Sequence, residues 1–547
     1  MPATRRDLLR AAPALAAAPS LVTGIAPFGG PDLALAQASG GTLRIGMTAA
    51  SVPLPNGQTD QGGEGQRFMG YTVFDSLVFW DLSRSDAPSR LVPNLATAWE
   101  VDRADTTRWI FRIRPGVRFH DGSLFTAQAA QWNFEKILDN QAPHFDPRQS
   151  AQGRSRIPTV AKATALSDEV LEVRTSVPDA LLPYGIAWIV MSSPAQWERV
   201  GRSWDAFLNA PSGTGPFRCT AWSVRERAEL VANRDYWNEA RRPRLDRVIL
   251  LPMPEANSRT AALRAGQVDW IEAPAPDAIP SLRQAGMRIV TNEYPHVWLW
   301  HFSMLEGSPW RDIRVRRAAN LAVDRDGIRE LLGGLMQPAV GLLTPSSPWF
   351  GSPTFKVRHD VAEARRLMAE AGFTPQRPLS TKVLIPGQGS GMMQPIPMNE
   401  AIQQGLREAG INVTFEVVEW NALTNAWRAG AKDPLSRGAS AHNNSYFSQD
   451  PFTALIRHLD STLVTPRGTN WGWYQDPAMD ALFNRIRTGF GEGEVDRAAA
   501  EAHTRIVDEA LFLFVAHDLN ARAMSQRVRG FVQARNWFQD LGPVSMG

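Results

Sequence analysis

Apolar and polar residues alternate along several short runs of the chain, and apolar residues recur at helical spacing in others. Alternating or β-branched apolar residues predict strands over residues 42–47, 217–222 and 245–251. A helix is predicted over 256–266, because that run ends at Ala265-Gly266 and glycine commonly follows the last turn of a helix. Strands followed by helices of this kind indicate an α/β layer structure.

The second half of the chain continues the alternation of helix and strand. Helices are predicted over 314–320, 362–372 and 399–410, and the last is followed by a predicted strand over 411–418. In the first half, an aromatic-rich helix is predicted over 66–82. Helix–glycine–strand units are the building blocks of a doubly wound domain.

Length and charge narrow the class of protein. With 547 residues, the chain exceeds the roughly 250–300 residues at which one core stops growing, so two or three domains are expected. An apolar fraction of 44% and a charged fraction of 21% are typical of globular proteins. The net charge is only +3, so no nucleic acid or other polyanion is predicted as a partner.

The N-terminus has the composition of an export signal. Residues 4–10 resemble a twin-arginine motif, and the apolar stretch over 11–22 is too short for a stable membrane anchor. Small residues at Ala36 and Ala38 predict cleavage before Ser39. An ordinary general-secretory signal is the alternative, and both routes predict a periplasmic protein.

Motifs for catalysis and cofactor binding are missing from the sequence. It contains no His-Glu-x-x-His, no Gly-x-Ser-x-Gly and no phosphate-binding Gly-x4-Gly-Lys-Ser/Thr pattern. His120-Asp121 has no identifiable nucleophile as a partner and is interpreted as a turn at the end of a strand. The single Cys219 excludes an intramolecular disulfide and cysteine-based zinc sites. We predict a protein that is not an enzyme and that has no cofactor and no metal site.

Three blocks of sequence carry a resemblance to a known family. The first contains an alternating strand that turns at Pro115-Gly116, re-enters as a second strand and closes with His-Asp-Gly. The blocks are residues 91–122, residues 213–269, which start with Gly-Thr-Gly-Pro-Phe and end with Leu-Arg-Ala-Gly-Gln-Val-Asp, and residues 312–325. In these blocks the chain resembles the solute-binding proteins of ABC importers, in the family that carries peptides and nickel.

The resemblance implies an α/β fold of the two-lobed periplasmic-binding-protein type (class II, or cluster C), with an extra inserted subdomain in the first lobe. The implied parts are an export signal (1–38), the first lobe (39–80 and 213–293), its inserted subdomain (81–212), the second lobe (294–518) and a C-terminal return to the first lobe (519–547). The implied function is to capture a peptide-like or other small solute in the interlobe cleft, as a monomer, and to deliver it to an ABC permease and ATPase at the inner membrane. A ligand-presenting sensor subunit and an exported hydrolase are the alternatives.

Aromatic side chains supply most of the candidate ligand contacts. The chain has 19 tryptophans and 6 tyrosines, and residues two apart in a strand share a face, as predicted for Trp298 with Trp300 and for Trp471 with Trp473. Flat, amphipathic rings in a cleft cover ligand surface while the indole N–H orients the ligand. The predicted cleft residues are Gln66, Phe68, Trp298, Trp300, His442, Asn444, Tyr446, Phe447, Trp471 and Trp473.

One loop departs from the family pattern. In peptide-binding members, an aspartate four residues before a proline pairs with the free amine of the peptide, and counting back from Pro451 places Phe447 at that position. A buried ammonium needs a carboxylate, so a free-amine peptide is disfavoured unless Asp450 faces the cleft. The histidine of the nickel-binding branch is not matched either, because His458 lies at a different spacing. Phe447 therefore predicts a solute whose matching end is uncharged or aromatic, stacked between Phe447 and one of Trp300, Trp471 or Trp473. The alternative is that Phe447 belongs to the core beneath the loop.

Overall fold

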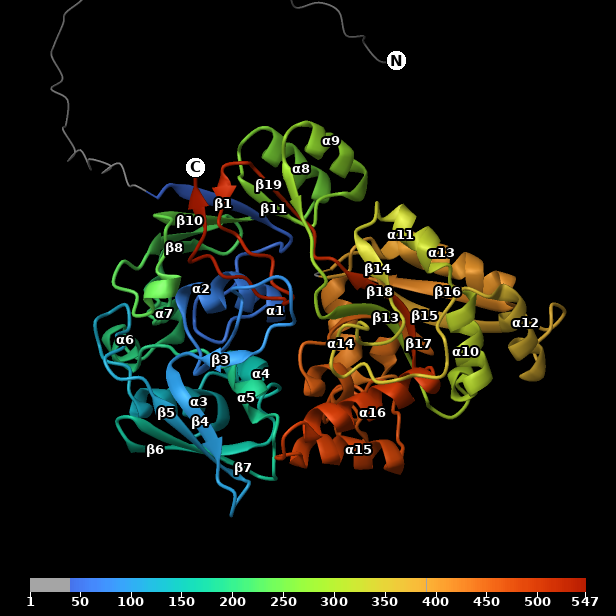
Figure 1. The fold of residues 1–547 in the computed structure, drawn as a ribbon, viewed down its shortest axis with the longest axis horizontal. Helices are drawn as coiled ribbons and strands as arrows, with labels where there is room; N and C mark the ends of the chain where they lie inside the picture. Colours follow the sequence, from blue (N-terminus) through green and yellow to red (C-terminus); the bar gives the residue numbers. More distant parts are fainter. Residues whose placement is uncertain (1–39, 390) are drawn as a thin grey trace, which may run out of the picture. The chain divides into compact units, whose positions relative to one another are not determined.

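The computed structural model of the protein describes residues 40–389 and 391–547. The predicted export signal lies outside these residues. The described residues from 40 onward belong to one compact unit, and three β-sheets of four or more strands organise it (Figure 1).

A seven-stranded sheet forms the centre of the first lobe. Its strands, in spatial order, are β12 (Arg288–Val290), β19 (Arg522–Met524), β11 (Trp270–Glu272), β1 (Thr42–Met47), β10 (Arg247–Pro252), β9 (Arg227–Ala232) and β8 (Phe217–Ser223). Strand β1 runs parallel to both β10 and β11, and the outer pairs are antiparallel. Alternate residues of β1, Leu43 and Ile45, are fully buried in the core of this lobe. The accompanying helices are α1 (Gly62–Gly65), a π-helix (Gln66–Gly70), α2 (Tyr71–Val73), α8 (Ala256–Arg264) and α9 (Ile279–Gln284).

A four-stranded antiparallel sheet is formed by strands that lie, in the sequence, between β1 and β8 of the seven-stranded sheet. Its order is β4 (Ala96–Val101), β5 (Arg108–Ile113), β7 (Val170–Thr175) and β6 (Val160–Ser167). Helix α3 (Ala127–Leu138) packs on it and contributes Phe134 to the core that also contains Phe111 and Leu171. The helix is capped by Thr126, whose hydroxyl accepts a hydrogen bond from the Ala129 N–H. The other elements of this region are β2 (Val78–Trp80), β3 (Leu91–Pro93), α4 (Pro147–Gly153), α5 (Leu182–Ile186), α6 (Pro194–Arg199) and α7 (Trp204–Asn209).

Helix α3 carries a buried lysine that has no carboxylate partner in an ion pair among the described residues. The Nζ of Lys136 donates to the Asn133 Oδ1 at 2.7 Å and to the Ser192 Oγ at 2.9 Å. The Lys136 side chain is fully buried, and this burial lowers its pKa from 10.5 to about 7. The Ser192 hydroxyl in turn donates to the Asn56 carbonyl, so Lys136 links the inserted helix to a loop beside the seven-stranded sheet.

A six-stranded sheet forms the second lobe. Its order is β14 (Met336–Pro338), β18 (Phe512–Asp518), β13 (His296–Phe302), β17 (Ala441–Phe447), β15 (Leu379–Pro386) and β16 (Ile411–Val418). One face of β13 contributes Trp298 and Trp300 to one core, and the other face contributes Val297 and Leu299 to a second core. The helices of this lobe are α10 (Ile313–Ala322), α11 (Arg325–Leu331), α12 (Val361–Glu370), α13 (Pro395–Glu408), α14 (Trp420–Ala429), a π-helix (Phe452–Ile456), α15 (Pro477–Thr488) and α16 (Glu494–Asp508).

The chain passes between the two lobes twice. It leaves the first lobe between β12 and β13 and returns between β18 and β19, and the two passages are joined by a hydrogen bond from the Asn292 N–H to the Leu519 carbonyl at 3.1 Å. Next to the return, the Glu272 carboxylate pairs with Arg67 and with Arg522, both at 3.0 Å, and all three side chains are buried. None of the helices in the described part of the chain is both long and apolar enough to span a membrane.

Most strands and helices predicted from local patterns are confirmed, among them the strand over 411–418, but three predictions are wrong. The helix predicted over 66–82 ends at Val73, because Phe74 adopts an extended conformation and Val78–Trp80 pairs as β2 with β3. The second strand expected after Pro115-Gly116 is reduced to a single bridge between Arg118 and Leu124. Trp471 and Trp473 lie in a turn instead of a strand, and Trp473 adopts a positive φ of 59°.

Candidate interlobe solute site

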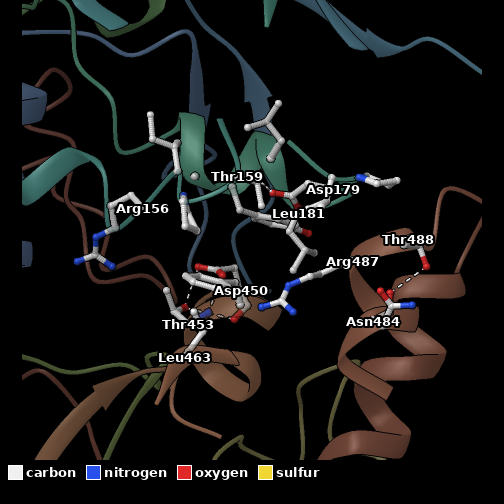
Figure 2. Close-up of a pocket in the computed structure, with 18 of the residues that line it drawn as sticks. Arg156, Thr159, Asp179, Leu181, Asp450, Thr453, Leu463, Asn484, Arg487 and Thr488 are labelled. Atoms are coloured by element: carbon white, nitrogen blue, oxygen red, sulfur yellow. Dashed lines mark hydrogen bonds between the residues drawn. The ribbon is translucent and has the colours of Figure 1, made fainter. Parts of the chain in front are cut away.

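A cavity of about 470 Å³ lies between the two lobes. Its lining comes from residues 156–188, next to the four-stranded sheet, and from residues 450–488 of the second lobe (Figure 2). The first group contributes Arg156, Tyr184 and Trp188, and the second contributes Asp450 and Thr453. This volume lies within the range of small-molecule sites, which are typically ~300–1,000 Å³.

Phe447 brings an aromatic ring of the second lobe against the first lobe. It is the last residue of β17, and its ring centroid lies 5.6 Å from that of Trp188 and 5.1 Å from that of Trp537, edge-to-face in both cases. The ring also lies against Gly63, where a Cβ atom would overlap both Phe447 and Trp537. Trp188 also lines the cavity, so the Phe447 contact adjoins the cavity through Trp188.

Trp188 is held in place through its backbone. The Trp188 carbonyl accepts hydrogen bonds from the Gln58 Nε2 at 3.0 Å and from the Gln66 Nε2 at 3.4 Å. The Tyr71 hydroxyl donates to the preceding Ala187 carbonyl at 2.5 Å. Gln66, one of the predicted cleft residues, thus contacts the backbone of a residue that lines the cavity, and we regard it as a positioning residue.

Two charged residues of the cavity wall, Asp450 and Arg156, differ in the contacts that their charged groups make. The Asp450 carboxylate accepts from the Thr453 N–H at 2.9 Å and from the Thr453 hydroxyl at 2.8 Å, and burial raises its pKa. The Arg156 guanidinium lies over the Trp188 ring, 3.7 Å from its centroid. Burial, followed by the nearby charge of Arg457, lowers the pKa of Arg156 to about 9.

Three of the predicted aromatic contacts lie in the cores of the lobes. Trp298 donates from its Nε1 to the Met392 carbonyl at 3.1 Å, and Trp300 donates to the Asn399 Oδ1 at 2.8 Å. Both indoles are fully buried in the second lobe, and Phe68 is fully buried in the first. These side chains have packing partners on every side in the present arrangement.

Three further predicted residues form one buried cluster on the face of β17 opposite Phe447. The Tyr446 hydroxyl is hydrogen-bonded to the His301 Nδ1 at 2.9 Å and to the His442 Nε2 at 3.2 Å. The Trp471 ring lies 4.6 Å from that of His442, and His458 stacks on Tyr446 at 3.8 Å. Burial lowers the pKa of His442 to about 3, so this histidine is neutral at neutral pH.

The remaining two candidates also lie away from Phe447. The Asn444 side-chain oxygen accepts from the Ser445 N–H at 2.8 Å. The Lys432 ammonium lies over the Trp473 ring, and the Trp473 Nε1 donates to the Thr465 hydroxyl at 3.1 Å. Among the described residues, the aromatic side chains in contact with Phe447 are Trp188, His296 and Trp537. A solute stacked between Phe447 and one of Trp300, Trp471 or Trp473 stays a prediction.

Sequence reasoning missed the first-lobe side of this site. Trp188, Trp537 and Arg156 lie far from Phe447 along the chain, and neither their spacing nor the local pattern marks them. Phe447, which the loop comparison singled out as facing a solute, contacts Trp188 and Trp537 of the first lobe. Which of the ten candidates contact a solute stays a prediction.

Comparisons with known proteins assign the family. The profile of the bacterial extracellular solute-binding proteins, family 5 Middle, matches residues 90–459. Di/tripeptide-binding protein 2 of Pseudomonas aeruginosa (strain UCBPP-PA14) is 26% identical over 474 residues, covering 83% of this chain and 86% of that protein. The periplasmic oligopeptide-binding protein OppA of Escherichia coli (strain K12) is 24% identical over 480 residues, covering 83% and 84%.

The fold agrees with solved structures. The ABC transporter-associated periplasmic binding protein DppA of Helicobacter pylori, in complex with the peptide STSA, superposes with a TM-score of 0.78 at 20% identity, covering 93% of this chain and 98% of that one. Two lobes, each built on its own sheet and joined by two chain passages, define the class of two-lobed periplasmic-binding proteins. The chain belongs to the bacterial extracellular solute-binding proteins, family 5, which confirms the resemblance to the solute-binding proteins of ABC importers. Members of this family are binding proteins for transport.

Proposed function

We propose that the protein, after export to the periplasm, captures a small peptide-like solute in the cavity next to Phe447 and delivers it to an ABC permease and ATPase at the inner membrane. The peptide-like character is supported by the relatives named for di/tripeptides and oligopeptides. The site itself is supported by the cavity that residues of both lobes line.

The contact of Phe447 with Trp188 and Trp537 carries this proposal. A residue of the second lobe that packs on aromatic residues of the first makes that part of the site depend on lobe closure. A solute that binds the cavity contacts both lobes at once and favours the closed arrangement over an open one. The protein would then carry the solute with its lobes closed.

The residues around Phe447 also indicate which end of a peptide-like solute faces it. An apolar ring stands where the peptide-binding relatives are expected to carry an aspartate, and the nearby Asp450 carboxylate is already hydrogen-bonded twice to Thr453. A free ammonium group at this end would therefore find no aspartate at position 447 and would have to share the Asp450 carboxylate with Thr453. An uncharged or aromatic end, packed edge-to-face against Phe447, suits the site better.

A binding screen tests the proposed function. Di- and tripeptides, N-acetylated peptides, sugars and metal chelates are compared by thermal shift, and positive compounds by small-angle scattering. A true solute at a hundredfold excess over its Kd should stabilise the folded protein by about 2.7 kcal/mol and make the particle more compact. If no class of compound raises the melting temperature, the proposed function is refuted.

The variant Phe447→Asp tests the position of the solute within the site. We expect it to weaken binding of N-acetylated peptides and to strengthen binding of the same peptides with a free amine, because it restores a carboxylate next to the ligand. Affinities are measured by calorimetry, and melting temperatures are recorded for both proteins.

Phe415→Asp is the matched control, since Phe415 is also partly buried but packs against Trp300 inside the second lobe. A folded Phe447→Asp protein with unchanged preference would show that Phe447 does not select the solute.

A further inference from the structure

We propose that the region that carries the four-stranded sheet (residues 96–188) latches onto the end of α15 and holds the two lobes closed before any solute binds. This contact, the interlobe latch, consists of Arg103, Trp109, Ala180 and Leu181 on one side and of Arg487 and Phe490 on the other. The latch acts without a solute, so its test is separate from that of the proposed function.

Each side of the latch places one apolar side chain against the core of the other side. Leu181, which directly precedes α5, is 5% exposed and belongs to the buried cluster that also contains Leu482 and Ile486 of α15. In return, Phe490 packs on the core of the four-stranded sheet, where its ring centroid lies 6.3 Å from that of Trp109. Opening the lobes would expose apolar surface of both side chains to water, which favours the closed arrangement.

The end of helix α15 takes hydrogen bonds from the first lobe. The last four carbonyls of an α-helix have no partner within the helix. Helix α15 ends at Thr488, and its Arg487 carbonyl accepts from the Ala180 N–H at 2.6 Å. Two residues beyond the helix, the Phe490 carbonyl accepts from the Arg103 Nη1 at 2.8 Å. Both hydrogen bonds cross between the lobes, so both are lost when the lobes separate.

The two sides of the latch are each held by contacts within their own lobe. The Asp179 carboxylate accepts from the Leu181 N–H at 3.0 Å and from the Thr159 hydroxyl at 2.5 Å. In the second lobe, the Arg487 guanidinium donates to the Asp460 carboxylate at 2.5 Å. Because these contacts do not involve the opposite lobe, the two surfaces lose little conformational freedom when they meet.

The latch also forms part of the wall of the interlobe cavity. Leu181 lines the cavity from the first lobe, and Arg487 lines it from the second (Figure 2). Arg103, Trp109 and Phe490 lie outside this lining. These three residues can therefore be changed to weaken the latch without altering the wall of the cavity.

Hydrogen exchange at the Ala180 amide, read by mass spectrometry at single-residue resolution, measures opening of the latch. This N–H exchanges when its hydrogen bond to the Arg487 carbonyl breaks, so its rate follows the fraction of open molecules. In the wild type without solute, it should exchange at least about tenfold more slowly than in an unfolded peptide of the same sequence. An unprotected Ala180 amide would overturn the latch.

Two variants weaken the latch from outside the cavity. Phe490→Ala should speed exchange at Ala180 about threefold to tenfold, because it removes the aromatic contact with Trp109. Arg103→Gln should speed it about twofold to tenfold, because it removes one hydrogen bond between the lobes. Arg103 is exposed, so its replacement leaves both cores intact.

Phe373→Ala and Arg118→Gln are the matched controls. Phe373 is also partly buried but packs on a core of the second lobe, and Arg118 is exposed and donates to the nearby Gly122 carbonyl at 2.8 Å. Neither control should change exchange at Ala180, and melting temperatures verify that all variants fold. Unchanged exchange in the two latch variants, or an equal rise in the controls, would overturn the latch. The solute screen would still decide the proposed function.

Discussion

Replacing Lys136 by methionine should change how the stability of the protein depends on pH. Methionine has a similar length but lacks the ammonium group, which is fully buried and donates to Asn133 and Ser192. The Asn133 Oδ1 would still accept from the Ser192 N–H at 2.8 Å. The variant therefore removes one titrating group, and the Asn133 side chain keeps one of its hydrogen-bond donors.

The pKa of Lys136 sets the size of the effect. Its pKa is about 7 in the folded protein and 10.5 in an exposed lysine, so between these values the unfolded chain binds a proton that the folded protein does not. The free energy of unfolding of the wild type therefore rises with pH in this window, by up to about 1.4 kcal/mol per pH unit. Between pH 7 and pH 9, this group should contribute an increase of about 2 kcal/mol.

Urea unfolding followed by tryptophan fluorescence at pH 7, 8 and 9 measures the effect. Groups common to both proteins, including the buried histidines, cancel in the difference between wild type and Lys136→Met. The wild type should gain about 2 kcal/mol relative to the variant over this range. Lys162→Met removes an exposed lysine of β6 and should give a profile parallel to that of the wild type. A parallel profile for Lys136→Met as well would refute the reasoning that burial lowers the pKa of Lys136.

Two further predictions concern the first lobe and export. Glu272→Gln should lower the free energy of unfolding by about 3–5 kcal/mol, because it leaves the buried Arg522 without its carboxylate partner and leaves Arg67 with Glu64 alone; an unchanged urea midpoint would contradict this. Replacing Arg5 and Arg6 together by lysine should leave uncleaved precursor in the cytoplasm, as judged by fractionation and immunoblotting, and normal periplasmic delivery would argue for the general-secretory route.

Local sequence patterns predicted the elements better than the site. The strand over Ile411–Val418 follows from its own residues, since alternation and a preceding helix end with glycine suffice to define it. Trp298 and Trp300 were correctly predicted to share a face, but the pattern does not tell whether that face meets a core or a ligand. The failed helix over 66–82 shows the same limit, because Val78–Trp80 becomes a strand only through its pairing with β3.

The site depends on contacts between distant segments. Phe447, Trp188, Trp537 and Gly63 come from four separate parts of the chain, and Phe447 meets the other three only when the lobes are in contact. The periodicity of apolar residues predicts one helix or strand at a time and does not predict contacts between distant segments.

The positions of β18 and β19 bear on how the chain acquires its structure. Strand β18 (Phe512–Asp518) lies inside the six-stranded sheet, between β14 and β13, and β19 (Arg522–Met524) lies inside the seven-stranded sheet, between β12 and β11. Because the ribosome releases the N-terminal end first, both sheets stay incomplete until the residues that form β18 and β19 have emerged. Such pairings across long sequence separations are slow to form. Folding of both sheets should be deferred until residues 512–524 have been synthesised, and a chain truncated before residue 512 should fail to fold in both lobes at once.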